Sequence, residues 1–500
     1  MYYIAPENRQ QLSLMNSLED MVAQDHYVRL IDDLIDRIVK ENENRFINKG
    51  LAKTGRKPYH PATLLKLYLY GYLNGVNSSR KLETECKRNI EMMWLLGNLI
   101  PDHKTISDFR KNNSEQIQLA VEQFNLFLKQ GGYLKAEVLS VDGSKIRANA
   151  GKVLSDDIEK RLNHLQQQIG GYLAELDGND RAEQTKENVT ELEKQQTNLE
   201  ENIKHLQQEI EKLKEQKKNF KEEGLDKYSP TDPDARLMKG REGKHFAYNV
   251  QAAIDSTHKL IAALEVSTQQ NDRALITPMI ATIRKKFSIT PKEIIADAGY
   301  SNIADIQKAE QEERVNCYVA LNDNQHQVKD QMQGFVFTYS AQTDRYTCIK
   351  GQPLVLTAKN KIDKKRGTSA SVYRGINCRP CEIKNDCTKS SARTIMRYTD
   401  RQWRDDYRQK MKSALGKTKL RLRKSLSEHP FGILKQWMGK IPIKLRGKKK
   451  VQTEMNIYHL AYNLKRMTSI ESFFNFNNLI EQHDWKIARQ TTGFLFFTPQ

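Results

Sequence analysis

Three carboxylate side chains stand at positions from which they could share divalent metal ions. Asp142 ends the apolar, β-branched stretch "AEVLSVD", and Asp297 ends a second such stretch, "KEIIAD". Glu428 is the one acid from Lys410 to Lys450, among fourteen Lys or Arg residues. Hard Mg²⁺ prefers oxygen ligands, and two ions about 3.5–4 Å apart can activate an attacking oxygen and stabilise a leaving one in phosphoryl transfer. These residue types point to metal-dependent chemistry on a phosphate ester, provided that the fold brings them together.

Each aspartate also has an ordinary structural interpretation. A strand-end aspartate commonly caps a turn or a helix, and this applies to Asp142 or Asp297 taken singly. Three neighbouring acids are interpreted as turn or cap residues: Asp232, Asp234 and Asp272. The joint pattern of two strand-end aspartates and a helical glutamate favours the metal-binding interpretation.

The elements that must position these acids alternate between strands and helices. After the strand that ends at Asp142 comes a long helical segment, and then the strands "KHFAYNVQAAID" and "HKLIAALEVST", which pair across a short turn. Next come a helix, the strand that ends at Asp297, a helix, the strand "VNCYVAL" and finally the helix with Glu428. This order is similar to that of the ribonuclease-H-like fold, so we expect a mixed sheet with both aspartates at one edge.

The remainder of the chain predicts additions to that core. The first 130 residues are helical in pattern: "HYVRLIDDLIDRIVKE" places Val28, Ile31, Leu34, Ile35 and Ile38 on one face. Pro61 stands near one helix start, and Thr105 or Ser107 is a candidate cap of another. From 156 to 220 the sequence is polar and glycine-poor, with heptad-like leucines, and predicts an antiparallel helical hairpin. That hairpin could dimerise, contact DNA or form a self-contained arm.

The predicted fold class is therefore mixed α+β, with a ribonuclease-H-like sheet flanked by helices. We divide the chain as follows: 1–133, a helical DNA-binding or dimerisation domain; 134–155, the first part of the core; 156–224, the hairpin insertion; 225–325, the second part of the core; 326–392, a cysteine-bearing insertion; 393–470, the helical part of the core that carries Glu428; and 471–500, a tail.

Four of the six cysteines are concentrated in one segment: Cys348, Cys378, Cys381 and Cys387. The C-x2-C step suits a thiolate knuckle, and "YTCIKG" offers a fourth ligand from a hairpin. A tetrahedral structural Zn²⁺ is one interpretation, and reduced thiols in a small packed insertion are the other. Cys86 and Cys317 are interpreted as ordinary buried thiols.

Charge and composition restrict the partners. The formal net charge is +19, and the stretch from Lys410 to Lys450 alone is strongly basic, so we expect nucleic acid as the partner. A basic solvated surface is the alternative. No run approaches the roughly 20 apolar residues that span a bilayer, and the start lacks the pattern of a secretory signal. We therefore expect no membrane span and a cytoplasmic location.

Four motifs resemble those of the DDE transposases of bacterial insertion sequences. "VDGSKIRANA" resembles the family's first-aspartate strand, "IADAGYSN" its second-aspartate motif and "SEHPFGILKQWMG" its glutamate motif. The fourth is the block "HPATLLKLYLYGYLNGVNSSRKLE" followed by "PDHKTISDFR", which resembles the helical domain that opens one subgroup. The resemblance implies that Asp142, Asp297 and Glu428 are the catalytic residues and that they bind two Mg²⁺ or Mn²⁺ ions.

The same resemblance implies a reaction and a DNA-contacting surface. The reaction would be hydrolysis at the ends of the element and attack of the freed 3′-hydroxyl on target DNA, with two or more copies of the protein assembled on double-stranded DNA at the nucleoid. Lys435, seven residues after Glu428, would meet a phosphate. The family often has Tyr and Arg seven and four residues before the glutamate, where this chain has Arg421 and Lys424. Lys cannot make the bidentate contact of Arg, so Arg423 or Arg421 could substitute.

Three further expectations remain open at this level. Asp272 in "QQNDRAL" is, by the resemblance, a supporting group of the site. A metal-dependent nuclease or a domesticated recombination factor would keep the fold without strand transfer. A non-catalytic DNA-binding repressor would have lost one of the three acids, and all three are present.

Overall fold

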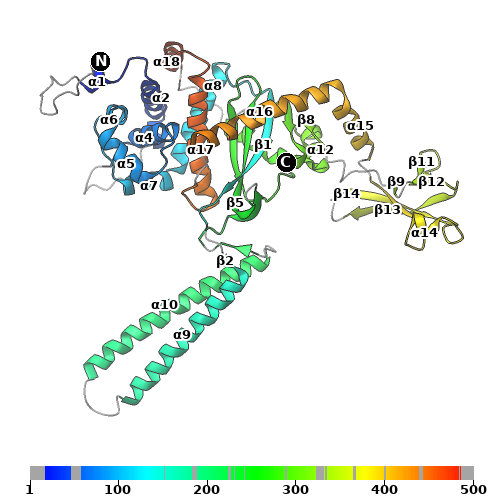
Figure 1. The fold of residues 1–500 in the computed structure, drawn as a ribbon, viewed down its shortest axis with the longest axis horizontal. Helices are drawn as coiled ribbons and strands as arrows, with labels where there is room; N and C mark the ends of the chain where they lie inside the picture. The colour runs from blue at the N-terminus through cyan, green and yellow to red at the C-terminus, as the bar shows by residue number, and fades with distance from the viewer. Residues whose placement is uncertain are drawn as a thin grey trace, which may run out of the picture.

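The computed structural model shows a group of helices, a mixed sheet and two projections from it (Figure 1). The residues that it describes are 17–46, 58–150, 153–182, 189–222, 227–229, 231–240, 243–287, 290–321, 331–332, 335–363, 368–398, 401–438, 443–483 and 485. Within these ranges, no helix has both the length and the apolar character needed to cross a bilayer.

The amino-terminal part is helical, as predicted. Its helices are α1 (Leu18–Met21), α2 (Tyr27–Glu41), α3 (Glu43–Phe46), α4 (Pro61–Leu73), α5 (Ser79–Arg88), α6 (Ile90–Leu96), α7 (His103–Asn112) and α8 (Ser114–Gln130). The predicted face of α2 is buried at all five positions: Val28, Ile31, Leu34, Ile35 and Ile38. Pro61 is the first residue of α4, where its missing N–H has no partner to lose. The predicted caps Thr105 and Ser107 are wrong, because Asp102 caps α7 by accepting from the backbone N–H groups of Lys104 and Thr105.

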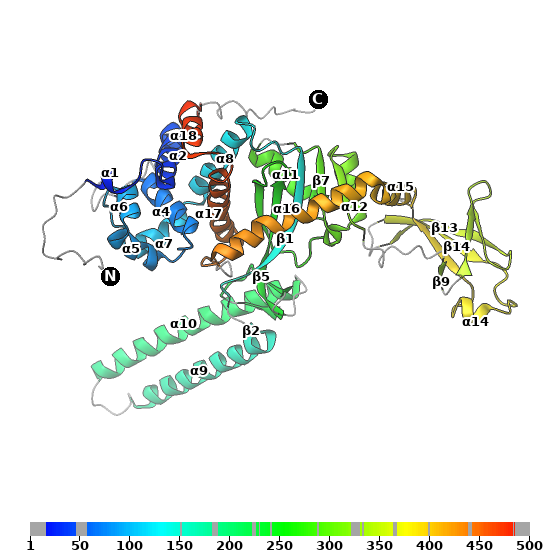
Figure 2. The same cartoon turned by 45° about the horizontal axis from the view of Figure 1, so that its top comes forward.

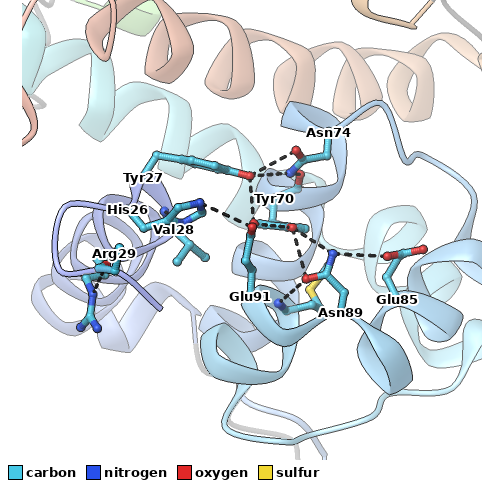
Figure 3. Close-up of polar contacts among 11 residues, drawn as sticks. His26, Tyr27, Val28, Arg29, Tyr70, Asn74, Glu85, Asn89 and Glu91 are labelled. Atoms are coloured by element: carbon cyan, nitrogen blue, oxygen red, sulfur yellow. Dashed lines mark hydrogen bonds and ion pairs between the residues drawn. The ribbon is translucent and has the colours of Figure 1, made fainter. Parts of the chain in front are cut away.

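A cluster of polar side chains joins α2, α4 and α6 (Figure 3). The Tyr70 hydroxyl donates to Glu91 Oε2 at 2.7 Å, and His26 Nε2 lies 3.5 Å from Glu91 Oε1. Tyr27 donates to the same carboxylate and also bonds Asn74. Burial and the bond to Glu91 raise the pKa of Tyr70, so its hydroxyl stays protonated and able to donate. The cluster therefore fixes three helices relative to one another.

The mixed sheet contains the five strands that the sequence predicts and a sixth, β4 (Arg236–Gly240), that it did not. Its members are β1 (Val138–Arg147), β4 (Arg236–Gly240), β5 (Gly243–Asp255), β6 (Ile261–Ser267), β7 (Glu293–Ala296) and β8 (Asn316–Val319). The strands lie in the order β4-β5-β1-β7-β8, and β6 also pairs with β5. β5 is antiparallel to β1 and β6, whereas β1, β7 and β8 are mutually parallel. β1 lies between β5 and β7, and its first half, from Val138 to Val141, pairs with β7.

Helices cover the sheet and join it to the amino-terminal part. α11 (Ile276–Phe287) contacts β6, and α12 (Ile303–Gln311) contacts β8. α16 (Ala414–Met438) crosses β1, β5, β7 and β8, as both views show (Figures 1 and 2). α17 (Lys448–Met467) packs on β6, α4 and α8, and α18 (Phe473–Gln482) contacts α2. One hydrophobic core accordingly runs from the amino-terminal helices into the sheet.

A helical hairpin projects from the sheet (Figure 2). It consists of α9 (Ser155–Ala182) and α10 (Val189–Glu222), and it is joined to the sheet through the paired strands β2 (Val153–Leu154) and β3 (Lys227–Tyr228). Leu165, Ile203 and Ile210 are buried in it, and Arg161 pairs with Glu209 at 3.2 Å. The predicted hairpin is confirmed, and these contacts show one helix packed on the other.

A small antiparallel sheet forms the second projection. Its strands are β11 (Thr338–Ser340), β12 (Arg345–Thr347), β13 (Pro353–Asp363), β14 (Thr368–Gly375) and β15 (Thr394–Tyr398), with the short helix α14 (Lys384–Cys387) beside them. A separate pair, β9 (Gln331–Met332) and β10 (Phe335–Val336), precedes it. The small core consists of Phe337, Tyr346, Leu354, Tyr373 and Ile395. The chain then returns to the mixed sheet through α15 (Arg401–Lys412).

Candidate active site

Strands β1 and β7 place Asp142 and Asp297 side by side. The two strands are parallel, and Val141 is in register with Ala296, so each aspartate is the residue that follows a paired position. Val141 and Ala296 are completely buried, which anchors both strands up to the point where the carboxylates begin. Asp297 also caps the short 3₁₀ helix η1 (Ala298–Tyr300), accepting from the Gly299 N–H at 2.7 Å. The two carboxylates are neighbours, as expected, but the prediction that Asp142 ends its strand is wrong. β1 continues to Arg147 because it stays paired with β5 beyond the point where its pairing with β7 stops.

The Asp142 carboxyl is held in a poorly solvated place. Its pKa is raised from the ordinary 3.8 to about 6, mainly by burial; the Arg423 guanidinium opposes this rise and the neighbouring Asp297 carboxylate adds to it. The Gly143 backbone N–H lowers this pKa and the Asp272 carboxylate raises it. A carboxyl that costs free energy to ionise is a group that gains from a nearby cation.

We expect Asp142→Asn to raise the thermal unfolding temperature of the metal-free protein at pH 8 by a few degrees. The pKa of Asp142 is higher in the folded than in the unfolded chain, so the folded chain binds the proton more tightly. The free energy of unfolding therefore falls as the pH rises from about 4 to about 6, and that cost persists at higher pH. The asparagine variant avoids the cost, and the difference should vanish below about pH 4.

Thermal unfolding in EDTA across this pH range measures the effect. Asp102→Asn is the control, because it makes the same chemical change at a carboxyl whose pKa is lowered, to about 2, by its capping bonds. Asparagine also caps well, and this variant should not raise the unfolding temperature at pH 8. A difference between Asp142→Asn and the natural protein that did not change with pH would contradict the assigned cause.

Helix α16 brings a cation to the two aspartates. Arg423 Nη2 lies 3.7 Å from Asp297 Oδ2, and one turn earlier Lys419 contacts Glu293 at the start of β7. Arg421 and Lys424 lie on the same helix with exposed side chains. Of the three predicted phosphate-binding cations whose side chains the structure describes, Arg423 is thus the one found at the carboxylates.

The third predicted acid, Glu428, lies on the same helix. The helical span of α16 includes both Glu428 and Lys435, but their side chains lie outside the described part of the structure. Glu428 follows Arg423 by five residues, which corresponds to about 7.5 Å along the helix axis. The assignment of Glu428 as a ligand therefore remains a prediction.

Asp272 belongs to a polar group on the other face of β1. Its Oδ1 accepts from Lys145 at 3.0 Å, Asn249 at 2.7 Å and Gln251 at 2.9 Å. Gly143 is opposite Gln251, and a Cβ added to Gly143 would lie 2.6 Å from Asp272 Oδ1. Glycine at this position therefore leaves room for Asp272 directly behind Asp142. Sequence reasoning found Asp272 only through the family motif and did not find its three partners.

The four clustered cysteines surround one cavity in the small sheet. Cys348 lies in the turn between β12 and β13, Cys378 and Cys381 follow β14, and Cys387 ends α14. The Arg393 backbone N–H approaches Cys378 Sγ at 3.4 Å. All four thiols are free, and so are the buried Cys86 and Cys317.

Neither group of predicted metal ligands forms a complete ligand set as placed. Within the described residues, no three His, Cys, Asp or Glu side chains come close enough to share a metal ion. For the aspartate pair the missing third ligand is Glu428, whose side chain lies outside those residues. Two hard carboxylates beside a single cation still suit Mg²⁺ or Mn²⁺ by ligand type.

Two family models match the chain. Residues 16–112, which hold most of the amino-terminal helices, match one described as "Transposase domain (DUF772)". Residues 347–468 match one described as "Transposase DDE domain", and this range includes the four clustered cysteines and Glu428. Asp142 and Asp297 lie between the two matched ranges. No curated protein and no solved structure is significantly similar to the chain.

Proposed function

Because the chain belongs to the DDE-type transposases of insertion elements, we propose that it cuts DNA at the ends of its element and joins them to target DNA. In this proposal Asp142, Asp297 and Glu428 are the catalytic residues. The observation that carries it is the parallel pairing of β1 and β7, which sets two carboxylates side by side under a basic helix.

The sheet topology supports a ribonuclease-H-like core. Read along β6, β5, β1, β7 and β8, the sheet has an antiparallel meander on one side and two parallel strands on the other. In chain order without β4, the first and fourth strands carry the two aspartates. Asp297 directly follows β7, and Asp142 lies within β1, directly after its last pair with β7. That is the arrangement on which the sequence resemblance rests.

The carboxylates would hold Mg²⁺ or Mn²⁺. When bound, two such ions would activate the attacking oxygen and stabilise the leaving oxygen. The chain supplies the rest: Arg421 and Lys424 are exposed on α16 and neutralise phosphates, and Lys435 is proposed to do the same. Asp142 is half-buried, and its partial desolvation strengthens these charge interactions.

The decisive test uses labelled DNA that carries the native ends of the element, incubated with Mg²⁺ or Mn²⁺. A transposase cuts at the ends and joins the 3′-hydroxyl to a second DNA. A nuclease or domesticated factor would cut without joining, and a repressor would bind without cutting. Sedimentation with and without end DNA reports whether two or more copies assemble on it.

We also propose that Cys348, Cys378, Cys381 and Cys387 hold a structural zinc ion. Their placement around one cavity, from two separate loops, supports this. As placed, the thiols surround the cavity rather than meet at ligating distance, so zinc would have to draw the two loops together.

We expect the natural protein, purified under reducing conditions, to contain about one zinc ion per chain. Cys378→Ser combined with Cys381→Ser should remove nearly all of it, because each loss leaves an incomplete thiolate set. Elemental analysis of the purified proteins measures this. Cys86→Ala is the control, since that buried thiol lies in the amino-terminal helices and should leave the zinc content unchanged. A natural protein without zinc would favour the alternative of reduced thiols in a packed insertion.

A further inference from the structure

The guanidinium of Arg423 stands where the two aspartates most need positive charge. Its Nη2 lies 3.7 Å from Asp297 Oδ2, and its side chain is 21% exposed. Among the charged neighbours of Asp142, Arg423 has the largest effect, and that effect favours the ionised carboxylate. One arginine thus neutralises part of the charge of both acids.

Arg423 is held more loosely than two other cations of the same helical region, Lys419 and Lys410. Lys419 makes a close ion pair with Glu293, and Lys410 of α15 lies 2.5 Å from Glu310. The distance from Arg423 to Asp297 exceeds hydrogen-bond range, and within the described residues Arg423 Nε is buried without a partner. Among the described residues, the contact of the Arg423 guanidinium with Asp297 is therefore a charge interaction and not a hydrogen bond.

A divalent ion bound to the two aspartates and the Arg423 guanidinium beside them would each weaken the other's attraction to the carboxylates. Both carry positive charge, and like charges at such distances repel strongly in a partly buried site. The loose contact also makes Arg423 easy to displace, because few hydrogen bonds are lost when it moves. Once displaced, its planar fork is free to bind a phosphate of the DNA.

We propose that Arg423 is the resident counter-cation of the Asp142–Asp297 pair, which an incoming divalent ion must displace. Arg423 then sets the metal affinity of the site and transfers its charge from carboxylate to DNA phosphate as metal binds. This inference rests on the proposed function, because it takes the two aspartates as metal ligands.

The test is the affinity of the DNA-free protein for Mn²⁺, measured by isothermal titration calorimetry. Arg423→Gln keeps a similar length and removes the charge, and we expect it to bind Mn²⁺ about tenfold more tightly than the natural protein. Arg423→Lys keeps the charge and should bind within about threefold of the natural protein. Lys419→Gln is the matched control: it removes an equal charge from the same helix, four residues earlier, and should also change the affinity less than about threefold.

Thermal unfolding supplies a second measurement that does not depend on catalysis. In EDTA, Arg423→Gln should unfold at a lower temperature than the natural protein, because the two carboxylates lose their counter-charge. Saturating Mn²⁺ should raise the unfolding temperature of this variant more than that of the natural protein.

The outcomes separate this inference from the function on which it rests. If Asp297→Asn abolishes Mn²⁺ binding but Arg423→Gln binds no more tightly than the natural protein, the role of Arg423 is wrong and the metal site stands. An equal gain in Arg423→Gln and Lys419→Gln would also overturn it, since the effect would then be general charge. If Asp142→Asn and Asp297→Asn bind Mn²⁺ like the natural protein, the metal site itself is misassigned.

Discussion

Asp297→Asn is expected to reduce cleavage of element-end DNA at least about 10³-fold, with binding of that DNA retained. The substitution removes the charge that would hold a divalent ion, and losing about 4 kcal/mol of transition-state stabilisation corresponds to that factor. Asparagine can still accept the Gly299 N–H bond that Asp297 accepts at 2.7 Å, so η1 keeps its cap. The expected loss is therefore chemical rather than structural. Asp142→Asn and Glu428→Gln should behave in the same way.

Cleavage and joining of labelled DNA, together with a binding assay at fixed salt, measure this prediction. Asp102→Asn is the matched control, because it makes the same chemical change at the cap of α7 and should leave both activities intact. If one of the three acids could be replaced with full activity, that residue would not be a ligand. If all three variants lost DNA binding as well, the acids would have a structural role instead.

The pair of aspartates could be predicted because local sequence determines most of its geometry. Short β-branched runs mark the parts of β1 and β7 that pair with each other, and each acid directly follows its run. The order of the elements then makes the two strands parallel neighbours, which the register of Val141 with Ala296 confirms. The sequence did not reveal that β1 continues past Asp142 to Arg147, because that half of the strand is held by pairing with the distant β5. The sequence did not reveal the polar group behind Asp142, because Lys145, Asn249 and Asp272 meet only through strand pairing and a loop.

The roles of the cations on α16 could not be predicted, because they depend on how the helix is rotated over the sheet. Arg421, Arg423 and Lys424 are equivalent in sequence as phosphate-binding residues. In the structure Arg423 shares a face with Lys419 and points to the aspartates, while Arg421 and Lys424 are exposed. The packing of α16 on the sheet determines which of these three cations faces the aspartates.

The small antiparallel sheet shows a different limit of sequence reasoning. β11, β12 and β15 are short strands of three to five residues. The core depends on contacts between distant aromatic residues such as Tyr346 and Tyr373, whose ring centroids lie 5.2 Å apart. Polar residues occupy much of β13 and β14, so their alternation is weak. The four clustered cysteines predict an insertion in this segment, but their spacing does not indicate its strands.

Glu454→Ala is expected to lower the free energy of unfolding by about 3–5 kcal/mol, the largest stability effect predicted for a single change here. Glu454 lies in α17, is completely buried and faces Arg110 at 3.5 Å. Tyr72 donates to its Oε1 at 3.2 Å, and the backbone N–H groups of Lys444 and Leu445 donate to its Oε2. Without the carboxylate, the buried Arg110 guanidinium loses its counter-charge, and the Tyr72 hydroxyl and two backbone amides lose their acceptor.

The position of Glu454 explains why this loss should reach the whole molecule. Arg110 and Tyr72 belong to the amino-terminal helices, whereas Lys444 and Leu445 form the link between α16 and α17. The carboxylate therefore ties the helical part to the segment that follows the proposed catalytic helix. Destabilisation at this point should separate the two parts of the shared core rather than loosen one helix.

Urea unfolding followed by circular dichroism measures the change. Glu209→Ala is the control, because it breaks the exposed pair with Arg161 in the hairpin and should cost less than about 1 kcal/mol. Replacing both partners, Arg110→Met with Glu454→Leu, should recover part of the loss, since no buried charge is then left unpaired. If Glu454→Ala cost no more than Glu209→Ala, the buried pair would contribute little. If the double variant were less stable than either single variant, the damage would come from packing and not from the uncompensated charge.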